Sequence, residues 1–173
     1  MKRTSLAHWP CSIARTMDLL GDWWTPLVLR EAFYGIKRFD DFQRSLGLAR
    51  NTLTARLQRL VEEGMLERVP YQRRPERFEY QLTDKGREFF PVLAAMMAWG
   101  DRWLTGTAGA PVTLRHTECG HETRAAVVCE HCREPLTADS VHSEMGPGFP
   151  AKLAERADVR ERFGPAAGDS RRP

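Results

Sequence analysis

The sequence contains no long apolar run. No stretch of its 173 residues reaches the roughly 18 consecutive apolar residues that a membrane-spanning helix needs. Residues 1–11 (MKRTSLAHWPC) include basic side chains but no apolar segment, so they do not predict a signal peptide. We therefore expect a cytoplasmic protein with no membrane partner, whose thiols stay reduced.

Lysine and cysteine are scarce. There are only four lysines, so arginine supplies most of the positive charge, and a net charge of +3 does not by itself indicate nucleic-acid binding. Cys11 stands alone, whereas Cys119, Cys129 and Cys132 are grouped. In a reducing compartment, cysteines are metal ligands or reactive thiols more often than disulfides.

Residues 47–64 (GLARNTLTARLQRLVEEG) carry the clearest periodic pattern. Leu53, Leu57 and Leu60 recur at helical spacing, and Gly64 suits the left-handed position that ends a helix. The opposite face carries amide, hydroxyl and arginine side chains, which suit base edges and phosphates in a major groove. A surface helix with a solvated polar face is the alternative interpretation.

Shorter helices are expected before this segment. Residues 11–20 and 40–46 have apolar side chains at helical spacing, and Asp40 is the expected cap of the second. Residues 23–35 form an almost wholly apolar helix, with Thr25 as its expected N-cap. The sequence thus predicts a helical core.

Two strands are expected after residue 64. Residues 65–71 and 77–82 flank a loop that is rich in arginine, which predicts a hairpin with a basic tip. Thr83 is expected to cap a long apolar helix that ends near residue 104. The apolar surface of this helix exceeds what one small domain can cover, so we expect a partner subunit to cover it.

The order helix, helix, helix, two-stranded wing, helix predicts a mainly α fold with a small β wing, of the α+β class. This is the order of a winged helix-turn-helix, in which the helix before the hairpin enters the groove. A basic hairpin tip can reach a flanking phosphate or the minor groove. A winged helix that serves only protein contacts is the alternative, but it would not require arginines at the tip.

The segments CSIARTMDLLGDWW, LARNTLTARLQRLVEEGML and RFEYQLTDKGREFF occur together and in order. With them the chain resembles the HxlR-type winged-helix regulators, relatives of the MarR-like group, over residues 9–103. The resemblance implies a homodimer on a palindrome-like operator, with the first and last helices of the domain at the dimer interface. Two recognition helices would enter successive major grooves, about 34 Å apart. Repression is the commoner behaviour in this family.

Nine polar residues are the candidate DNA contacts. Arg50 and Thr54 lie nearer the apolar edge on a helical wheel, and Arg56 could instead hold Glu63 or a core carboxylate. The arginines of the hairpin suit phosphate or minor-groove contact. The full set is Arg50, Asn51, Thr52, Thr54, Arg56, Arg59, Arg73, Arg74 and Arg77.

Cys11 precedes the first expected helix. Some members of the family that the chain resembles sense oxidants, quinones or aldehydes through a cysteine at this position. A helix N-terminus and the neighbouring Arg15 and His8 would favour the reactive thiolate. The alternative is an inert cysteine that is buried at the dimer interface.

The grouped cysteines form two pairs, His116-x-x-Cys119 and Cys129-x-x-Cys132. Two such pairs at the ends of strands 112–116 and 123–128 would give a tetrahedral zinc site, as in a zinc ribbon. His121 is an alternative ligand, and His131 is a further spare candidate. A unit of about thirty residues needs such a staple, which favours structural zinc over a metal-free hairpin with a redox pair.

We therefore expect a winged-helix domain at residues 8–105, a zinc-ribbon-like hairpin at 112–142 and a tail at 143–173 that is disordered at least from about 164. The predicted function is DNA-binding transcription regulation by a homodimer, with a small-molecule or oxidant effector and no enzyme activity. One alternative is a zinc-assisted protein-interaction adaptor. Another is a thiol enzyme that uses Cys129 and Cys132, but the βαβ context of a thioredoxin-like fold is missing.

Overall fold

The structure is a computed structural model that describes residues 4–164. Two compact units divide the chain: one is Leu19–Ala126, and the other comprises the described residues on either side of it. Nearly all of the tail predicted to be disordered from about residue 164 lies outside the described residues. None of the helices in the described part of the chain has both the length and the apolar character needed to cross a bilayer.

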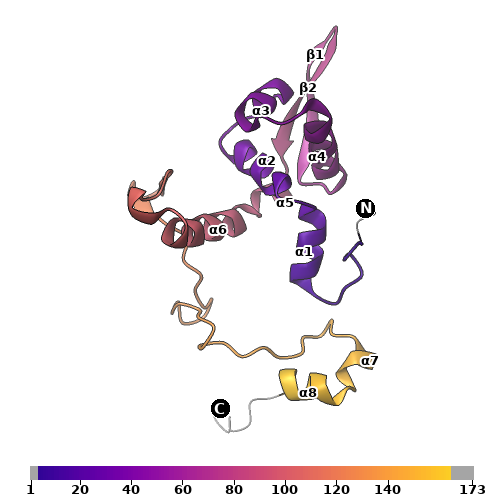
Figure 1. Ribbon diagram of the computed structural model, residues 1–173, viewed down its shortest axis with the longest axis vertical. Coiled ribbons are helices and arrows are strands. Elements are labelled where there is room, and N and C mark those ends of the chain that lie inside the picture. Colours follow the sequence, from indigo (N-terminus) through magenta and orange to yellow (C-terminus); the bar gives the residue numbers. More distant parts are fainter. Residues whose placement is uncertain (1–3, 165–173) are drawn as a thin grey trace. The chain divides into compact units, whose positions relative to one another are not determined.

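Helix α1 (Ser12–Leu20) leads into the unit Leu19–Ala126, which contains a bundle of helices, a two-stranded ribbon and a further pair of helices. Figure 1 shows the ribbon projecting beyond α3 and α4 as a narrow wing. The predicted helical fold with a small antiparallel wing is confirmed. The elements are α2 (Trp24–Phe33), α3 (Phe39–Leu46), α4 (Arg50–Glu62), β1 (Leu66–Arg73), β2 (Glu76–Leu82), α5 (Asp84–Arg87) and α6 (Phe90–Trp103).

The apolar stripe predicted for α4 forms the centre of the core. Leu53, Leu57 and Leu60 are fully buried and pack with apolar side chains of α2, α3 and the start of β1. Each fully buried leucine contributes about 1.5–3 kcal/mol relative to an exposed one. The stripe therefore fixes which face of α4 points outward.

The starts of α2 and α3 differ from the prediction. Thr25 is not the N-cap of α2, because its side chain is buried and the Oδ1 atom of Asp22 accepts the N–H groups of Trp24 (2.9 Å) and Thr25 (3.2 Å). Asp40 does not cap α3 either, since it lies in the first turn of that helix, after Arg38. A capping side chain must lie just before the first helical turn, and local composition does not reveal where that turn begins.

The wing is a regular antiparallel ribbon. Its register runs from Leu66 opposite Leu82 to Arg73 opposite Glu76, with a shift between Pro70 and Gln72 that displaces one residue of β1. The strands predicted at 65–71 and 77–82 are confirmed, and they extend closer to the tip than expected. The tip consequently holds the arginines close together.

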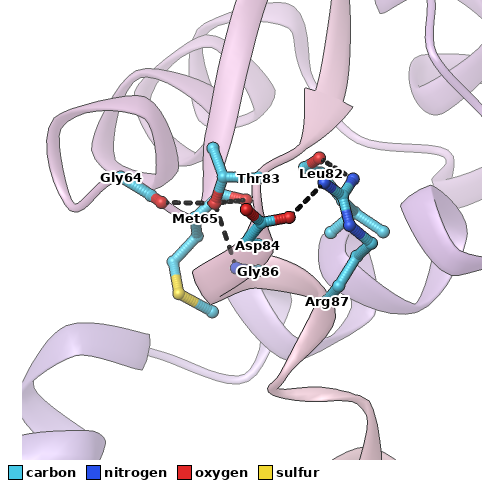
Figure 2. Close-up of polar contacts among 7 residues, drawn as sticks. All are labelled: Gly64, Met65, Leu82, Thr83, Asp84, Gly86 and Arg87. Carbon is cyan, nitrogen blue, oxygen red and sulfur yellow. Dashed lines mark hydrogen bonds and ion pairs between the residues drawn. The ribbon is translucent and has the colours of Figure 1, made fainter.

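A hydrogen-bonded joint fastens the end of α4 to the base of the wing (Figure 2). Thr83 caps α5 as predicted: its Oγ1 accepts the N–H of Gly86 (3.0 Å) and donates to the carbonyl of Gly64 (2.6 Å). A methyl group on Gly86 would lie 2.1 Å from the carbonyl oxygen of Met65, so only glycine fits there. The Nζ of Lys85 donates to the carbonyl of Glu63 (2.6 Å) and satisfies another free group at the end of α4.

The single long helix predicted from 84 to 104 is interrupted. It divides into α5 and α6 at Glu88 and Phe89, and α6 begins with Pro91 in its first turn. Proline has no N–H group and its ring clashes with the carbonyl four residues earlier, which kinks or breaks a helix at this point.

The strand predicted at 123–128 is wrong. Instead, β3 (Leu114–Arg115) pairs with β4 (Glu122–Thr123), and the chain reverses within a six-residue turn. Gly120, with a φ of 69°, allows that early reversal. Val128 pairs with Pro135 across a second turn. The remaining elements are η1 (Gly106–Ala108), α7 (Ala151–Ala154) and α8 (Ala157–Phe163).

Candidate nucleic-acid interface

The exposed face of α4 carries the polar residues that can reach DNA. Arg50, Asn51 and Thr54 are exposed, whereas Thr52 is half-buried. The guanidinium carbon of Arg50 lies 4.8 Å from the ring centroid of Phe39, and the Oγ1 of Thr54 donates to the carbonyl of Arg50 (2.9 Å). Arg50 and Thr54 therefore belong to the outward face, not to the apolar edge that the helical wheel suggested.

The two other candidate arginines of α4 are half-buried and bound to carboxylates. Arg56 forms an ion pair with Asp22, the residue between α1 and α2. Arg59 pairs with Glu63 (3.1 Å), the residue that follows the last residue of α4. The sequence suggested either Glu63 or a core carboxylate as the partner of Arg56. In the structure the partner is the carboxylate of Asp22, which lies outside α4. These two arginines are less free than Arg50 to contact a ligand.

The wing presents its arginines at the tip. Arg73, Arg74 and Arg77 are all exposed, at the end of the ribbon far from the core. The Nε2 of Gln72 donates to the carbonyl of Arg74 (2.9 Å) and braces the turn. Three guanidinium groups on a projecting ribbon suit contacts to phosphates beside a bound helix.

An open groove of about 650 Å³ runs between α3, the start of α4 and the wing. Its lining includes Arg38, Arg44, Arg50 and Arg77, together with acidic and aromatic side chains. The guanidinium of Arg38 stacks on Tyr71 at 4.6 Å and pairs with Glu79 at 3.3 Å. Arg38 and Arg44 were not among the predicted contacts. They precede and follow an acidic pair in α3, and the basic pair at 37–38 was the available signal in the sequence.

Cys11 is exposed immediately before α1. Its carbonyl accepts the N–H of Arg15 (3.0 Å), and the Nε of Arg15 donates to the carbonyl of Trp9 (2.8 Å). The guanidinium is therefore engaged with the backbone, and the exposure of the thiol is the feature that favours reactivity.

The pair His116/Cys119 and the pair Cys129/Cys132 lie in two turns that have the same hydrogen-bond pattern. In the first, the N–H of His116 donates to the carbonyl of His121 (2.9 Å), and the N–H of Gly120 donates to the carbonyl of His116 (2.8 Å). The Nδ1 of His116 and the Sγ of Cys119 are 3.3 Å apart. The first turn therefore brings two candidate ligands together by itself. His121 contributes its backbone carbonyl, which accepts the N–H of His116.

The second turn repeats that pattern. The N–H of Cys129 donates to the carbonyl of Glu134 (2.8 Å), the N–H of Arg133 donates to the carbonyl of Cys129 (3.0 Å), and Arg133 has a φ of 64°. The backbone N–H of Cys132, then that of His131, then the Cys132 thiol lower the pKa of Cys129 by hydrogen bonding to its sulfur. Among residues 4–164 no three His, Cys, Asp or Glu side chains are grouped to hold a metal ion, so each turn offers two ligands by itself.

A helix with an outward polar face, placed between a helical bundle and a two-stranded basic wing, defines a winged helix-turn-helix. A family model of the HxlR-like helix-turn-helix matches residues 19–108. The uncharacterized HTH-type transcriptional regulator Rv3095 of Mycobacterium tuberculosis is 48% identical over 143 residues, which cover 83% of this chain and 90% of that protein. The chain therefore belongs to the HxlR-like helix-turn-helix family.

Solved structures agree with this membership. The crystal structure of PA1607, a candidate transcription factor, is 38% identical with a TM-score of 0.74, and the match covers 83% of this chain and all of that one. The redox regulator HypR in its reduced form is 30% identical with a TM-score of 0.50, over 53% of this chain and 92% of that one. The protein is a DNA-binding transcriptional regulator of the helix-turn-helix type, a class that generally has no catalytic activity.

Proposed function

We propose that α4 enters the major groove of a specific operator while the wing contacts flanking phosphates. The observation that carries this proposal is the exposed polar face of α4, formed by Arg50, Asn51 and Thr54, beside a wing with three exposed arginines at its tip. Arginine and asparagine are the side chains that read guanine and adenine edges bidentately. The wing arginines add affinity that does not depend on sequence.

We also propose that the protein is a cytoplasmic homodimer that represses transcription from a palindrome-like operator. The support for the dimer is α6, whose side chains Val92, Met96, Trp99 and Trp103 are exposed although they are large and apolar. Such a patch on a soluble protein marks an interaction surface. A twofold pair of α4 helices would match two half-sites one helical turn apart.

Replacing Asn51 with alanine is expected to weaken operator binding about tenfold, or ~1.4 kcal/mol, because a bidentate contact to a base is lost. The loss should appear as relaxed specificity at one base pair.

Replacing Arg74 with alanine should instead weaken binding to all sequences alike and reduce the salt slope by about 1. Fluorescence anisotropy on a duplex selected from a random pool, over a series of salt concentrations, measures both effects.

The control is Thr107→Ala, an exposed polar residue in η1 outside α4 and the wing. Its affinity should match that of the wild type. An Asn51→Ala variant that keeps the wild-type affinity and the wild-type base preference at every operator position would contradict the role of Asn51 in base recognition.

We further propose that oxidants or electrophiles act on the regulator through Cys11. The exposed thiol before α1 supports this, as does the likeness to the redox regulator HypR. A modified Cys11 would alter α1, which we expect at the dimer interface, and so change the spacing of the two α4 helices.

Treatment with a quinone or peroxide is expected to reduce operator affinity of the wild type at least about tenfold, within the range of allosteric couplings. The Cys11→Ser variant should keep its affinity after the same treatment. The control is the Cys11→Ser variant before treatment, which should bind the operator as tightly as the untreated wild type. A Cys11→Ser variant that still responds to the oxidant would rule out this sensor.

The His116/Cys119 and Cys129/Cys132 turns are proposed to bind structural zinc. Each turn offers two soft or imidazole ligands, which together meet the four that tetrahedral zinc requires. The lowered pKa of Cys129 favours the thiolate that a metal binds. The repeated turn assigns equivalent positions to His116 and Cys129, and this supports His116 over His121 as the fourth ligand.

A further inference from the structure

One carboxylate of the helix-turn-helix holds two elements at once. Asp22 lies between α1 and α2, and its Oδ1 accepts the N–H groups of Trp24 (2.9 Å) and Thr25 (3.2 Å). Its other oxygen, Oδ2, forms an ion pair with the Nη2 of Arg56 in the middle of α4. A single aspartate therefore caps the N-terminus of α2 and ties α4 to it.

This ion pair is partly withdrawn from water. The side chains of Arg56 and Asp22 are 30% and 21% exposed. The Nε of Arg56 is buried and has no hydrogen-bond partner within residues 4–164. Removing the aspartate charge would leave a partly buried guanidinium without its counter-charge, which favours movement of the side chain and of the helix that carries it.

We propose that Arg56 is a positioning residue for DNA recognition: through Asp22 it fixes α4 against α2, and it does not itself bind the operator. The inference rests on the proposed function of α4 as the groove-entering helix. It assigns Arg56 a role different from that of Arg50, whose exposed guanidinium lies on the outward face. The DNA contacts of α4 then depend on a residue that never touches DNA.

The substitution Asp22→Asn separates the two roles of Arg56, because they predict opposite results. Asparagine is as good an N-cap as aspartate, so α2 keeps its cap while the negative charge is lost. If Arg56 contacted a phosphate, removing a neighbouring negative charge would leave DNA binding unchanged or strengthen it. If Arg56 positions α4, the same substitution weakens DNA binding.

The experiment measures fluorescence anisotropy of a fluorescein-labelled duplex, selected from a random-sequence pool with the wild-type protein, over a series of salt concentrations. We expect Asp22→Asn and Arg56→Gln each to bind about tenfold more weakly, within the range for coupled neighbours. The double variant should bind no more weakly than the weaker single variant. Both single variants should keep the wild-type salt slope, since no phosphate contact is lost.

The matched control is Asp158→Asn, which removes one negative charge from the exposed ion pair with Arg156 (2.9 Å) at the start of α8. Its affinity should stay within about twofold of the wild type, since surface pairs contribute little. Circular dichroism establishes that each variant is folded at the temperature of the assay. If Asp22→Asn does not fold, the salt slope of Arg56→Gln decides the question: an unchanged slope supports positioning, and a slope reduced by about 1 contradicts it.

Binding by Asp22→Asn as tight as that of the wild type, or tighter, would overturn the positioning role and leave the proposed function intact. If the wild type itself selects no sequence from the pool, the proposed function fails, and the positioning role fails with it. The failure of the positioning role is seen only in the variants, whereas the failure of the proposed function is already seen in the wild type. The two failures are therefore distinguishable.

Discussion

Replacing Met96 and Trp99 with glutamate is expected to produce a monomer that binds the operator about 100-fold more weakly, or weaker still. The two side chains are 52% and 60% exposed on the apolar face of α6, which also carries Val92 and Trp103. Two carboxylates on that face would have to be buried without counter-charges in a dimer. Loss of the dimer removes the gain from linking two half-site contacts, which is about 10²–10⁴ in affinity.

Sedimentation equilibrium gives the oligomeric state of this variant, and anisotropy on the selected duplex gives its affinity. The matched control is Leu136→Glu, which introduces the same charge at an apolar side chain that is 42% exposed outside α6. That variant should remain dimeric with wild-type affinity. A Met96→Glu/Trp99→Glu variant that stays dimeric would show that α6 is not the interface.

The second large effect is expected from histidine variants of the first Cys/His turn. Elemental analysis of the wild type should give about one zinc ion per chain, as four tetrahedral ligands imply. His116→Ala should lose most of that zinc, whereas His121→Ala, a substitution of the same size in the same turn, should retain it. In small units that are held together by a metal ion, the free energy of zinc binding supplies the free energy of folding. The loss of zinc should therefore be accompanied by local unfolding.

Limited proteolysis detects that unfolding. Cleavage within residues 112–135 should accelerate at least about tenfold in His116→Ala or after chelation, since few other contacts are available to hold such a short segment. Helix α4 and the wing should remain resistant to the protease, because an apolar core holds them in place. Retention of zinc by His116→Ala, together with its loss from His121→Ala, would assign the fourth ligand to His121. A zinc-free wild type with protected turns would refute the structural metal.

The elements that periodicity and capping chemistry determine could be predicted from the sequence. Leu53, Leu57 and Leu60 occur at the spacing that places them on one helical face, and all three are buried. Thr83 precedes a helix and caps it, because its hydroxyl can reach the free N–H groups of the first turn. The order of helices and strands then predicts the winged fold.

Features that depend on contacts between distant residues could not be predicted in this way. The partner of Arg56 is Asp22, which belongs to another element and is invisible to a local pattern. Arg50 and Thr54 are exposed, although a helical wheel places them nearer the apolar edge of the segment. A wheel records only the angular position about the helix axis and does not show which side chains the neighbouring elements cover.

The positions at which the chain reverses in the two C-terminal turns could not be predicted from the sequence either. Residues 123–128 have β-forming side chains, which predict a strand, but the hairpin closes earlier because Gly120 reverses the chain. A left-handed backbone at Arg133 produces the same reversal at the second turn. Only the backbone hydrogen bonds reveal that the two turns are equivalent.

The central claim is that two copies of α4 read two half-sites of one operator. Selection of duplexes from a random pool by the wild-type protein, followed by sequencing and hydroxyl-radical footprinting, tests it most directly. We predict two inverted half-sites with centres about 10 base pairs apart, and protection on one face of the duplex. Recovery of a pool with no sequence preference, or of a single half-site without symmetry, would contradict the account.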